Sequence, residues 1–408
     1  MAAEPHERLH ALDAVRGFAL LAGIVFHATV SFLPAPPGVP LWIVMDSQRS
    51  LTLAVLFHVL HTFRMTTFFL IAGFFAHLTF HRRGQGGFIR DRLKRIALPL
   101  LVGWPILFAS IVAVTIWAAI AGAHGQPLPP PPKYPGFPAF PLTHLWFLYL
   151  LLWFYAAILA LRGAAAALDR GGALGRGTDK VVGALIRSPF GLAALAAPAA
   201  VALYLTPGWA MWFGVPTPDS SLAPHPAAAI AYFSAFGFGW LLHRQVGLLE
   251  TLRRRWPLHL ALAVSLSAVG LAITGPAPLL AASTPGLAKA AFAGAFCLAS
   301  WTWTFAIMGL ALRFLSDLSP ARRYLADASY WLYLVHLPLI MALQTAVAQL
   351  VWAWPLKFAL ILGVAFPLML VSYELLVRHS FIGAILNGRR APRPSRAKDG
   401  ALAQEPAR

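Results

Sequence analysis

Apolar runs of about twenty residues recur along the whole chain, separated by short polar or Pro-rich segments. A helix of about twenty apolar residues crosses the roughly 30 Å of hydrocarbon in a bilayer. The runs lack the alternation of barrel strands, and lipid offers no partner to unpaired backbone groups, so helices are expected. The pattern predicts an all-α, polytopic membrane bundle of ten transmembrane helices. They are expected at residues 11–33, 51–79, 96–121, 144–161, 188–206, 226–243, 257–274, 287–312, 325–350 and 355–377.

Composition supports a membrane protein. Of the 408 residues, 59% are hydrophobic and 11% are charged, whereas a soluble domain carries about 25% charged residues. Residues 1–388 are expected to form one membrane domain, followed by a basic, disordered cytoplasmic tail at 389–408. Cys297 is the only cysteine, which excludes an internal disulfide and a CxxC metal motif. We expect a multi-pass protein of the inner (cytoplasmic) membrane.

The distribution of positive charge predicts the orientation. Of the 32 Lys and Arg residues, 26 lie at the N-terminus, in alternate loops and in the tail. Four lie in the other loops or within three residues of them, and two lie deeper inside predicted helices. This is the positive-inside pattern, so both termini are predicted to face the cytoplasm. The net charge of +18 therefore reflects topology, and a nucleic-acid partner is not expected.

The first predicted helix carries three ionisable residues, Asp13, Arg16 and His27. Arg16 and His27 are separated by three turns plus about 20°, so they share a face that Asp13 joins. A charge in hydrocarbon costs about 2.5–3.5 kcal/mol unless it is paired or hydrated, so this face should point into the bundle. His27 should lie about 16 Å further toward the outer side than Arg16. An ion pair at a helix end explains Asp13 and Arg16 equally well.

Other helices add imidazoles at a similar depth. His58, His61 and Arg64 follow one another at spacings of three on the second predicted helix. His144 opens the fourth predicted helix, and His336 lies at middle to outer depth in the ninth. The histidines are therefore predicted to gather in the outer half of the membrane.

A basic cluster marks the inner end of the third predicted helix. Arg90, Arg92, Lys94 and Arg95 stand there with Asp91 as their one acidic neighbour. Topogenic charge is one explanation of the cluster. Arg92 and Arg95 also lie one turn apart, which suits the phosphate groups of a cytosolic ligand.

Six segments carry a family resemblance. They are LDAVRGFALLAGIVFHA, FRMTTFFLIAGFF, FIRDRLKRIALP, HLWFLYLLL, SYWLYLVHLPLI and SYELLVRHSFIGAILNG. Together, over Leu12 to Gly388, the chain resembles membrane acyltransferase family three, most closely its members that succinylate periplasmic glucans. The resemblance implies a ten-helix enzyme that moves an acyl group from cytosolic acyl-CoA to a hydroxyl of a glycan on the outer side. It implies acyl-CoA, the glycan and the lipid bilayer as partners, with no bound cofactor.

The resemblance also implies residue roles. The family's motif of Arg, ten residues and His falls on Arg16 and His27, with its upstream Asp on Asp13. Its basic motif, linked to the acyl-donor side, falls on Arg92 and Arg95. A sugar hydroxyl that attacks a thioester needs a base, and imidazole, with an ordinary pKa of about 6.5, suits neutral pH. We therefore expect His27 to be the general base, with an acyl-histidine intermediate as the competing role.

The remaining residues are assigned by chemistry. Arg16 and Arg64 would hold substrate oxygens or the oxyanion, and a succinyl donor would favour Arg64 as an extra cation. Asp13 would orient Arg16 or pair with Glu374, whereas a pair between Glu374 and Arg378 at a spacing of four is the simpler reading. The expected substrate-binding residues are Arg64, His61, His144, His336 and Glu374. The expected acyl-CoA-binding residues are Arg92, Arg95 and Arg90, and no metal site is expected.

A second hypothesis is a secondary transporter or flippase for an organic anion or a lipid-linked sugar, with the intramembrane charges as a proton relay. It predicts broken helices at matching places in two halves, which the sequence does not show. A third hypothesis is a structural assembly subunit. The motifs do not separate succinyl from acetyl, and the glycan and the oligomeric state stay open.

Overall fold

The computed structural model describes residues 5–36, 39–123, 126, 136–169 and 171–388, with side chains from residue 10 onward. Within these ranges the secondary structure is helical, apart from one isolated β-bridge between Ala139 and Ser221. The prediction of an all-α protein is confirmed for the described residues. The predicted tail at 389–408 lies outside them.

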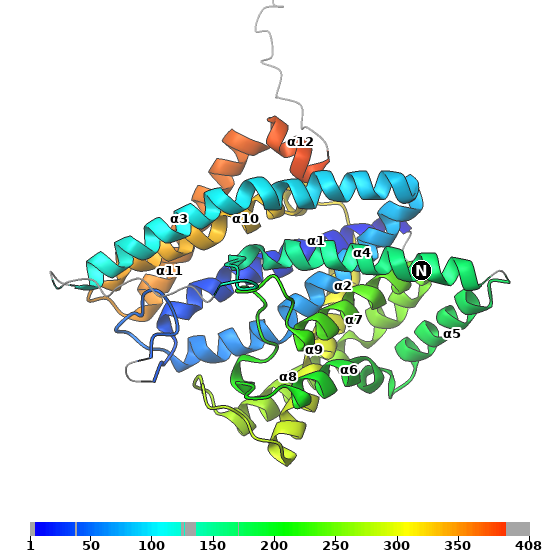
Figure 1. The fold of residues 1–408 in the computed structure, drawn as a ribbon, viewed down its shortest axis with the longest axis horizontal. Coiled ribbons are helices and arrows are strands. Elements are labelled where there is room, and N and C mark those ends of the chain that lie inside the picture. Colours follow the sequence, from blue (N-terminus) through cyan, green and yellow to red (C-terminus); the bar gives the residue numbers. More distant parts are fainter. Residues whose placement is uncertain (1–4, 37–38, 124–125, 127–135, 170, 389–408) are drawn as a thin grey trace, which may run out of the picture.

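Twelve α-helices and six short 3-10 or π segments make up this part of the chain, and most of the long helices run side by side (Figure 1). They are α1 (Pro5–Thr29), η1 (Val30–Phe32), α2 (Leu51–Arg92), η2 (Leu93–Ala97), α3 (Leu98–Ala123), η3 (Thr143–Leu145), α4 (Trp146–Leu168), α5 (Ala173–Arg187), α6 (Gly191–Leu205), η4 (Met211–Phe213), α7 (Pro226–Leu242), η5 (His243–Leu248), α8 (Leu249–Thr274), α9 (Leu287–Phe314), α10 (Pro320–Ala348), α11 (Trp354–Ser372), η6 (Tyr373–Val377) and α12 (Phe381–Asn387).

Seven helical stretches of the described chain are long and apolar enough to cross a membrane, or eight if a bent helix pair counts as one crossing. Two of them, Leu51–Ala123 and Pro226–Thr274, have 73 and 49 residues, far more than one crossing needs. Each contains a break, at Gly84 (φ 66°) and at Gln245 (φ −130°, ψ 59°) respectively. These helices confirm a polytopic bundle.

The predicted helix at 188–206 differs from the structure. Its counterpart α6 has only 15 residues and meets the additional helix α5 at an angle of 101°. The sequence pattern did not predict α5, because its apolar residues occupy one face of a short helix rather than a continuous run. The break at residues 188–190 falls at the edge of the predicted helix, and α6 is too short to cross a bilayer by itself.

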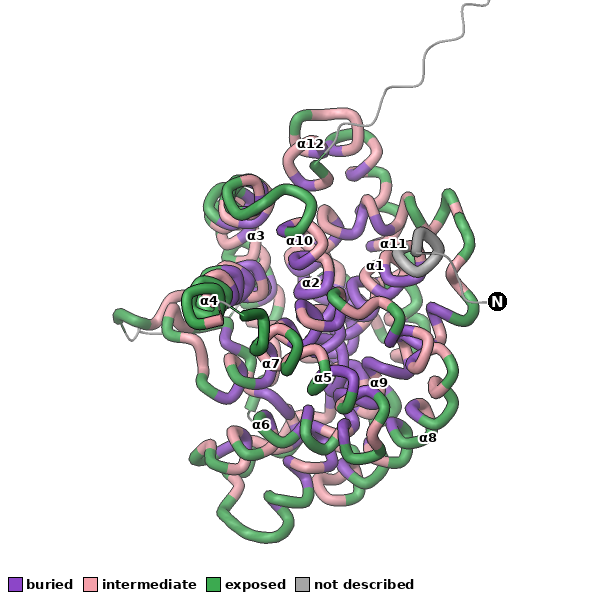
Figure 2. Tube along the Cα trace, turned by 90° about the vertical axis from the view of Figure 1, so that its right-hand side faces the viewer, coloured by how far each residue is buried: buried purple, intermediate pink, exposed green. Residues whose placement is uncertain are grey.

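Burial separates the interior of the bundle from its outer surfaces. Buried residues gather along the inner helices, whereas α5 and much of α3 are exposed (Figure 2). The exposed side of α3 carries large apolar residues, among them Leu101, Ile106 and Ile116. An apolar exposed face is what lipid contact requires of a transmembrane helix.

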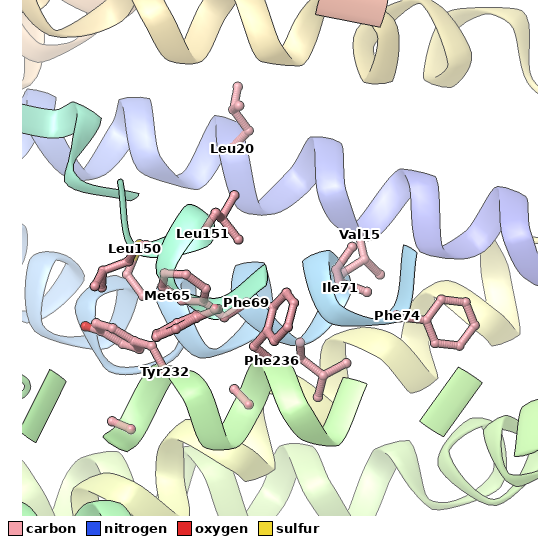
Figure 3. Close-up of a cluster of buried hydrophobic side chains, with 14 of the residues drawn as sticks. Val15, Leu20, Met65, Phe69, Ile71, Phe74, Leu150, Leu151, Tyr232 and Phe236 are labelled. Atoms are coloured by element: carbon pink, nitrogen blue, oxygen red, sulfur yellow. The ribbon is translucent and has the colours of Figure 1, made fainter. Parts of the chain in front are cut away.

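Two glycines permit the close crossing of α2 and α7. A Cβ atom at Gly73 would collide with the Phe236 carbonyl oxygen, and one at Gly239 would collide with the Leu70 carbonyl oxygen. Around this crossing, side chains from α1, α2, α4 and α7 belong to one buried apolar cluster (Figure 3). Small residues at helix crossings in membranes let the backbones meet at short range.

We expect Gly239→Ala to force α2 and α7 apart and to destabilise the protein by about 1–3 kcal/mol, as overpacking does. A lowered apparent Tm of the purified protein in detergent would show this. Gly237→Ala on the same helix is the control, because nothing lies within 4 Å of a Cβ placed there. Equal Tm values for the two variants would contradict a backbone contact at this crossing.

Candidate functional site

A cavity of about 390 Å³ opens between α1, α2, η2, α4, α10 and α12. Asp13 and Arg16 of α1 line it together with Arg92 and Arg95, which lie more than seventy residues away in sequence. Its remaining walls are mainly aromatic and aliphatic. They include Phe68, Phe75, Phe147, Tyr155, Tyr330 and Tyr333. The structure therefore joins the polar end of the first helix to the basic cluster before α3.

On α1, Asp13 and Arg16 form the expected ion pair, with 3.2 Å between Oδ1 and Nη1. Nη2 of Arg16 also donates to the carbonyl of Ala326 on α10, at 3.2 Å. These contacts favour Asp13 as the residue that orients Arg16, over the alternative pair with Glu374. Both partners are more than one third exposed, so the pair itself adds little stability.

Glu374 lies elsewhere, in η6. Its Oε1 is 2.9 Å from Nη1 of Arg378, and its Oε2 accepts a hydrogen bond from Tyr324 at 3.1 Å. Glu374 does not line the 390 Å³ cavity. Glu374 therefore forms the ion pair with Arg378 that their spacing of four residues predicts.

The basic cluster is organised by Asp91, whose side chain is only 3% exposed. Its carboxylate oxygens lie 2.7 Å from Arg83, 3.3 Å from Arg92 and 4.0 Å from Arg95. One carboxylate therefore holds three guanidinium groups in place. Arg83, which stands outside the cluster of four identified in the sequence, takes part in this arrangement.

Arg92 and Arg95 face the cavity by different contacts. Arg92 donates to Oγ1 of Thr79 at 2.9 Å, and its guanidinium lies 5.1 Å from the ring centroid of Tyr155. Arg95 donates twice to the carbonyl of Leu386 in α12, at 3.2 and 3.0 Å. Arg92 ends α2, and Arg95 lies in the π-helical turn η2 that leads into α3; such turns often mark functional sites.

Arg90, predicted as a third donor-binding residue, does not line the 390 Å³ cavity. It lines a separate hollow of about 480 Å³ with Arg83, Lys94 and Arg95. Arg95 borders both hollows, so it stands where they approach each other.

Three of the predicted imidazoles form one group. The ring centroids of His27 and His336 are 5.1 Å apart, and those of His336 and His144 are 5.3 Å apart. The backbone of α10 fixes two of the rings: His336 Nδ1 lies 2.7 Å from the Tyr333 carbonyl and His144 Nε2 lies 2.9 Å from the Leu334 carbonyl. Residues 309 positions apart in sequence thus meet, as the common depth of the histidines predicted.

His61 and Arg64 of α2 lie next to this group, because both contact the ring of Phe26, the neighbour of His27 on α1. The His61 ring stacks on Phe26 with 5.3 Å between centroids, and the Arg64 guanidinium lies 3.9 Å from the centroid of the same ring. The arginine also packs close to Gly23, where a Cβ atom would stand in ordinary contact, 3.6 Å from Cδ and Nη1 of Arg64. His58 instead has Nδ1 at 3.1 Å from the Trp212 carbonyl and does not contact the group.

Unsatisfied polar atoms mark this region. Nδ1 of His27, Nδ1 of His61 and Nε of Arg64 are buried without a hydrogen-bond partner. Arg64 is only 7% exposed, and it makes no ion pair within the described part of the chain. Buried polar groups are normally paired, so three orphaned atoms around one phenylalanine call for a ligand or for water.

Tyr333 connects the cavity to the imidazole group. It lines the cavity, its hydroxyl donates to the His144 carbonyl at 2.7 Å, and its ring centroid is 6.1 Å from that of His336. His27 does not itself line the 390 Å³ cavity. The site therefore has an inner, cationic part and an imidazole part, with Tyr333 at their boundary.

Sequence reasoning did not find Tyr155, Tyr330 or Tyr333, nor the role of Asp91 in holding the basic cluster. The tyrosines sit in apolar runs such as SYWLYL, where an aromatic residue reads as packing or as an interface anchor. Within the described residues, no group of three or more His, Cys, Asp or Glu side chains could hold a metal ion.

A polytopic helical bundle with intramembrane arginines and histidines is the class that the fold and site define. A family model described as an acyltransferase domain matches residues 9–374, so the chain belongs to acyltransferase family three. The chain is 32% identical over 103 residues to Glucans biosynthesis protein C of Escherichia coli (strain SMS-3-5 / SECEC), and 31% identical over the same length to the protein of that name in strain K12 / DH10B. Each match covers 25% of this chain and 26% of the relative. No solved structure matches the chain.

Proposed function

We propose that the protein transfers an acyl group from cytosolic acyl-CoA to a hydroxyl of a glycan on the outer side of the membrane. One observation carries the proposal: a cavity lined by five charged residues from three distant segments is also lined by Tyr333, which contacts the imidazole group of α1, η3 and α10. Family membership favours acyl transfer over the transporter or flippase hypothesis. The name of the relatives supports a glucan as the acceptor.

The proposed topology has ten crossings, with both termini in the cytoplasm and the protein in the inner membrane. The stretches of 73 and 49 residues are each long enough for two crossings, and the bent α5–α6 pair supplies one more. The other five stretches have 23 to 29 residues, the length of a single crossing. The distribution of Lys and Arg supports this arrangement.

The donor would bind on the inner side. Arg92 and Arg95 offer charge-assisted hydrogen bonds to phosphate oxygens, and Arg90 would add a contact from the neighbouring hollow. The aromatic wall of the cavity suits the thioester-bearing arm of the donor. Arg16 would meet donor oxygens at the side of the cavity formed by α1.

His27 would act as the general base. In the direct route, its imidazole takes the proton of the sugar hydroxyl while the hydroxyl oxygen attacks the thioester carbonyl. The carbon–sulfur bond then breaks, and the thiolate takes the proton to leave as free CoA. In the alternative route, His27 first accepts the acyl group and then passes it to the sugar. His336 and His144 support the His27 ring in either case.

Arg64 supports a succinyl rather than an acetyl group. A buried guanidinium without a carboxylate partner is costly, and a negatively charged ligand would relieve that cost. The free carboxylate of a succinyl group would provide this partner, whereas an acetyl group carries no charge. Phe26, the neighbour of His27 on α1, contacts the guanidinium and so places Arg64 near the position where the acyl group would react.

We expect His27→Ala to abolish release of free thiol from acyl-CoA in the presence of glycan, because the variant lacks the proposed general base. The assay uses the purified full-length protein in detergent and the glycan fraction of cells that lack the protein, with mass spectrometry of the product. His58→Gln is the control, since His58 faces Trp212 rather than the imidazole group. Substantial turnover by folded His27→Ala protein would refute the catalytic assignment.

Removal of the Arg92 guanidinium should weaken the binding of acyl-CoA and leave the binding of the glycan unchanged. We expect Arg92→Ala to raise the apparent KM for acyl-CoA at least tenfold while the KM for the glycan changes less than twofold. Arg82→Ala is the matched control, because Arg82 is exposed and lines neither hollow. A change confined to the KM for the glycan would contradict the assignment of Arg92 to donor binding.

Acyl selectivity tests the role of Arg64. We expect Arg64→Met to lower the ratio of kcat/KM for succinyl-CoA to that for acetyl-CoA by tenfold or more, because the charge that would neutralise the carboxylate is gone. Arg64→Lys, which keeps a positive charge, should retain more than a third of the wild-type ratio. An unchanged ratio in Arg64→Met would reject the succinyl assignment and leave the acyl-transfer proposal standing.

A further inference from the structure

Trp42 is the aromatic residue that the segment between η1 and α2 places against His27. The indole and imidazole centroids are 6.1 Å apart, with 27° between the ring planes. Both side chains are partly exposed. In the proposed topology this segment lies on the outer side, so Trp42 lies where the acceptor would approach.

The indole is held in a fixed orientation by Gln344 of α10, which is 1% exposed. Nε1 of Trp42 donates to Oε1 of Gln344 at 2.9 Å. Nε2 of the same amide donates to the carbonyls of His27 and Ala28, at 2.9 and 3.3 Å. One buried amide therefore couples the position of the indole to the end of α1 that carries the imidazole.

The chain around Trp42 is anchored as well. Asp46 and Lys357 form an ion pair with 2.8 Å between Oδ2 and Nζ, and their side chains are 2% and 0% exposed. The Asp46 amide donates to the Ser31 carbonyl, and the Ser50 amide donates to the Phe32 carbonyl, both at 2.9 Å. A buried pair of this kind fixes a geometry more than it adds stability. The segment thus has a defined position over the end of α1.

We propose that Trp42 is the platform of an acceptor subsite, on which a sugar ring of the glycan stacks so that one of its hydroxyl groups reaches His27. This inference rests on the proposed function. The indole N–H is already used by Gln344, so the ring face is what remains for recognition. A pyranose presents apolar C–H groups on its faces and hydroxyl groups around its edge, and an indole offers a large, rigid and amphipathic contact surface. Stacking on Trp42 would therefore direct the hydroxyl edge toward the neighbouring imidazole.

Kinetics of the full-length protein test the subsite. In the glycan assay described for His27, we expect Trp42→Ala to raise the acceptor KM at least tenfold and to leave the KM for acyl-CoA within twofold. Trp42→Phe keeps an aromatic face and should raise the acceptor KM less than threefold. Trp352→Ala is the matched control, because Trp352 is a 47% exposed tryptophan between α10 and α11, the connection that also faces outward in the proposed topology. An acceptor KM within twofold of wild type in Trp42→Ala would overturn the inference.

Equilibrium binding separates this inference from the proposed function. The catalytically silent His27→Ala protein should still bind the glycan fraction, whereas the double variant His27→Ala, Trp42→Ala should bind it at least tenfold more weakly. Equal affinities would overturn the acceptor platform even if the wild-type enzyme transfers acyl groups. Absence of turnover by the wild-type protein, with binding that depends on Trp42, would reject the enzyme proposal and keep the sugar site.

Discussion

A polar group at bilayer depth must find its partner inside the protein, and this constraint shapes the whole structure. Water is absent from the hydrocarbon, so an unpaired charge or hydrogen-bonding group costs several kcal/mol. The chain meets the demand in two ways. Buried near the ends of helices, Asp46 and Lys357 pair with each other, and Lys289 donates to the backbone carbonyl of Thr206 at 2.7 Å. Nε of Arg64 and Nδ1 of His27 have neither kind of partner among the described residues, and the proposed site lies beside them.

The arginines of the proposed site differ in whether a carboxylate pairs with them. Asp91 neutralises part of the basic cluster at the inner cavity, so Arg92 and Arg95 are held in place before any ligand arrives. Arg64 has no such carboxylate and lies over the ring of Phe26. In the proposed reaction, Arg92 and Arg95 would meet the anionic donor, whereas Arg64 would meet a charge carried by the acyl group.

Helix packing fixes the position of the cavity arginines relative to the imidazole group. The close crossing of α2 and α7 at Gly73 and Gly239 fixes the helix that carries His61 and Arg64. Contacts between α1 and α10, through Arg16 at one end and Gln344 near the other, fix the helix that carries His27. Because both helices are rigid, the spacing between the inner cations and the imidazoles follows from helix geometry, at about 1.5 Å per residue.

The sequence by itself determined the all-helical membrane class, the family, and which faces of α1 and α2 carry polar residues, because hydrophobic length and helical periodicity are local properties. It also predicted that His27, His144 and His336 share a depth. Only the tertiary structure decided which neighbours meet: that Asp91 gathers three arginines, that Glu374 and His58 stand apart, and that Tyr333 and Trp42 border the imidazoles. Periodicity fixes the face of a helix but not the helix that packs against it. That choice depends on long-range packing, such as the glycine-mediated crossing of α2 and α7, which no local pattern records.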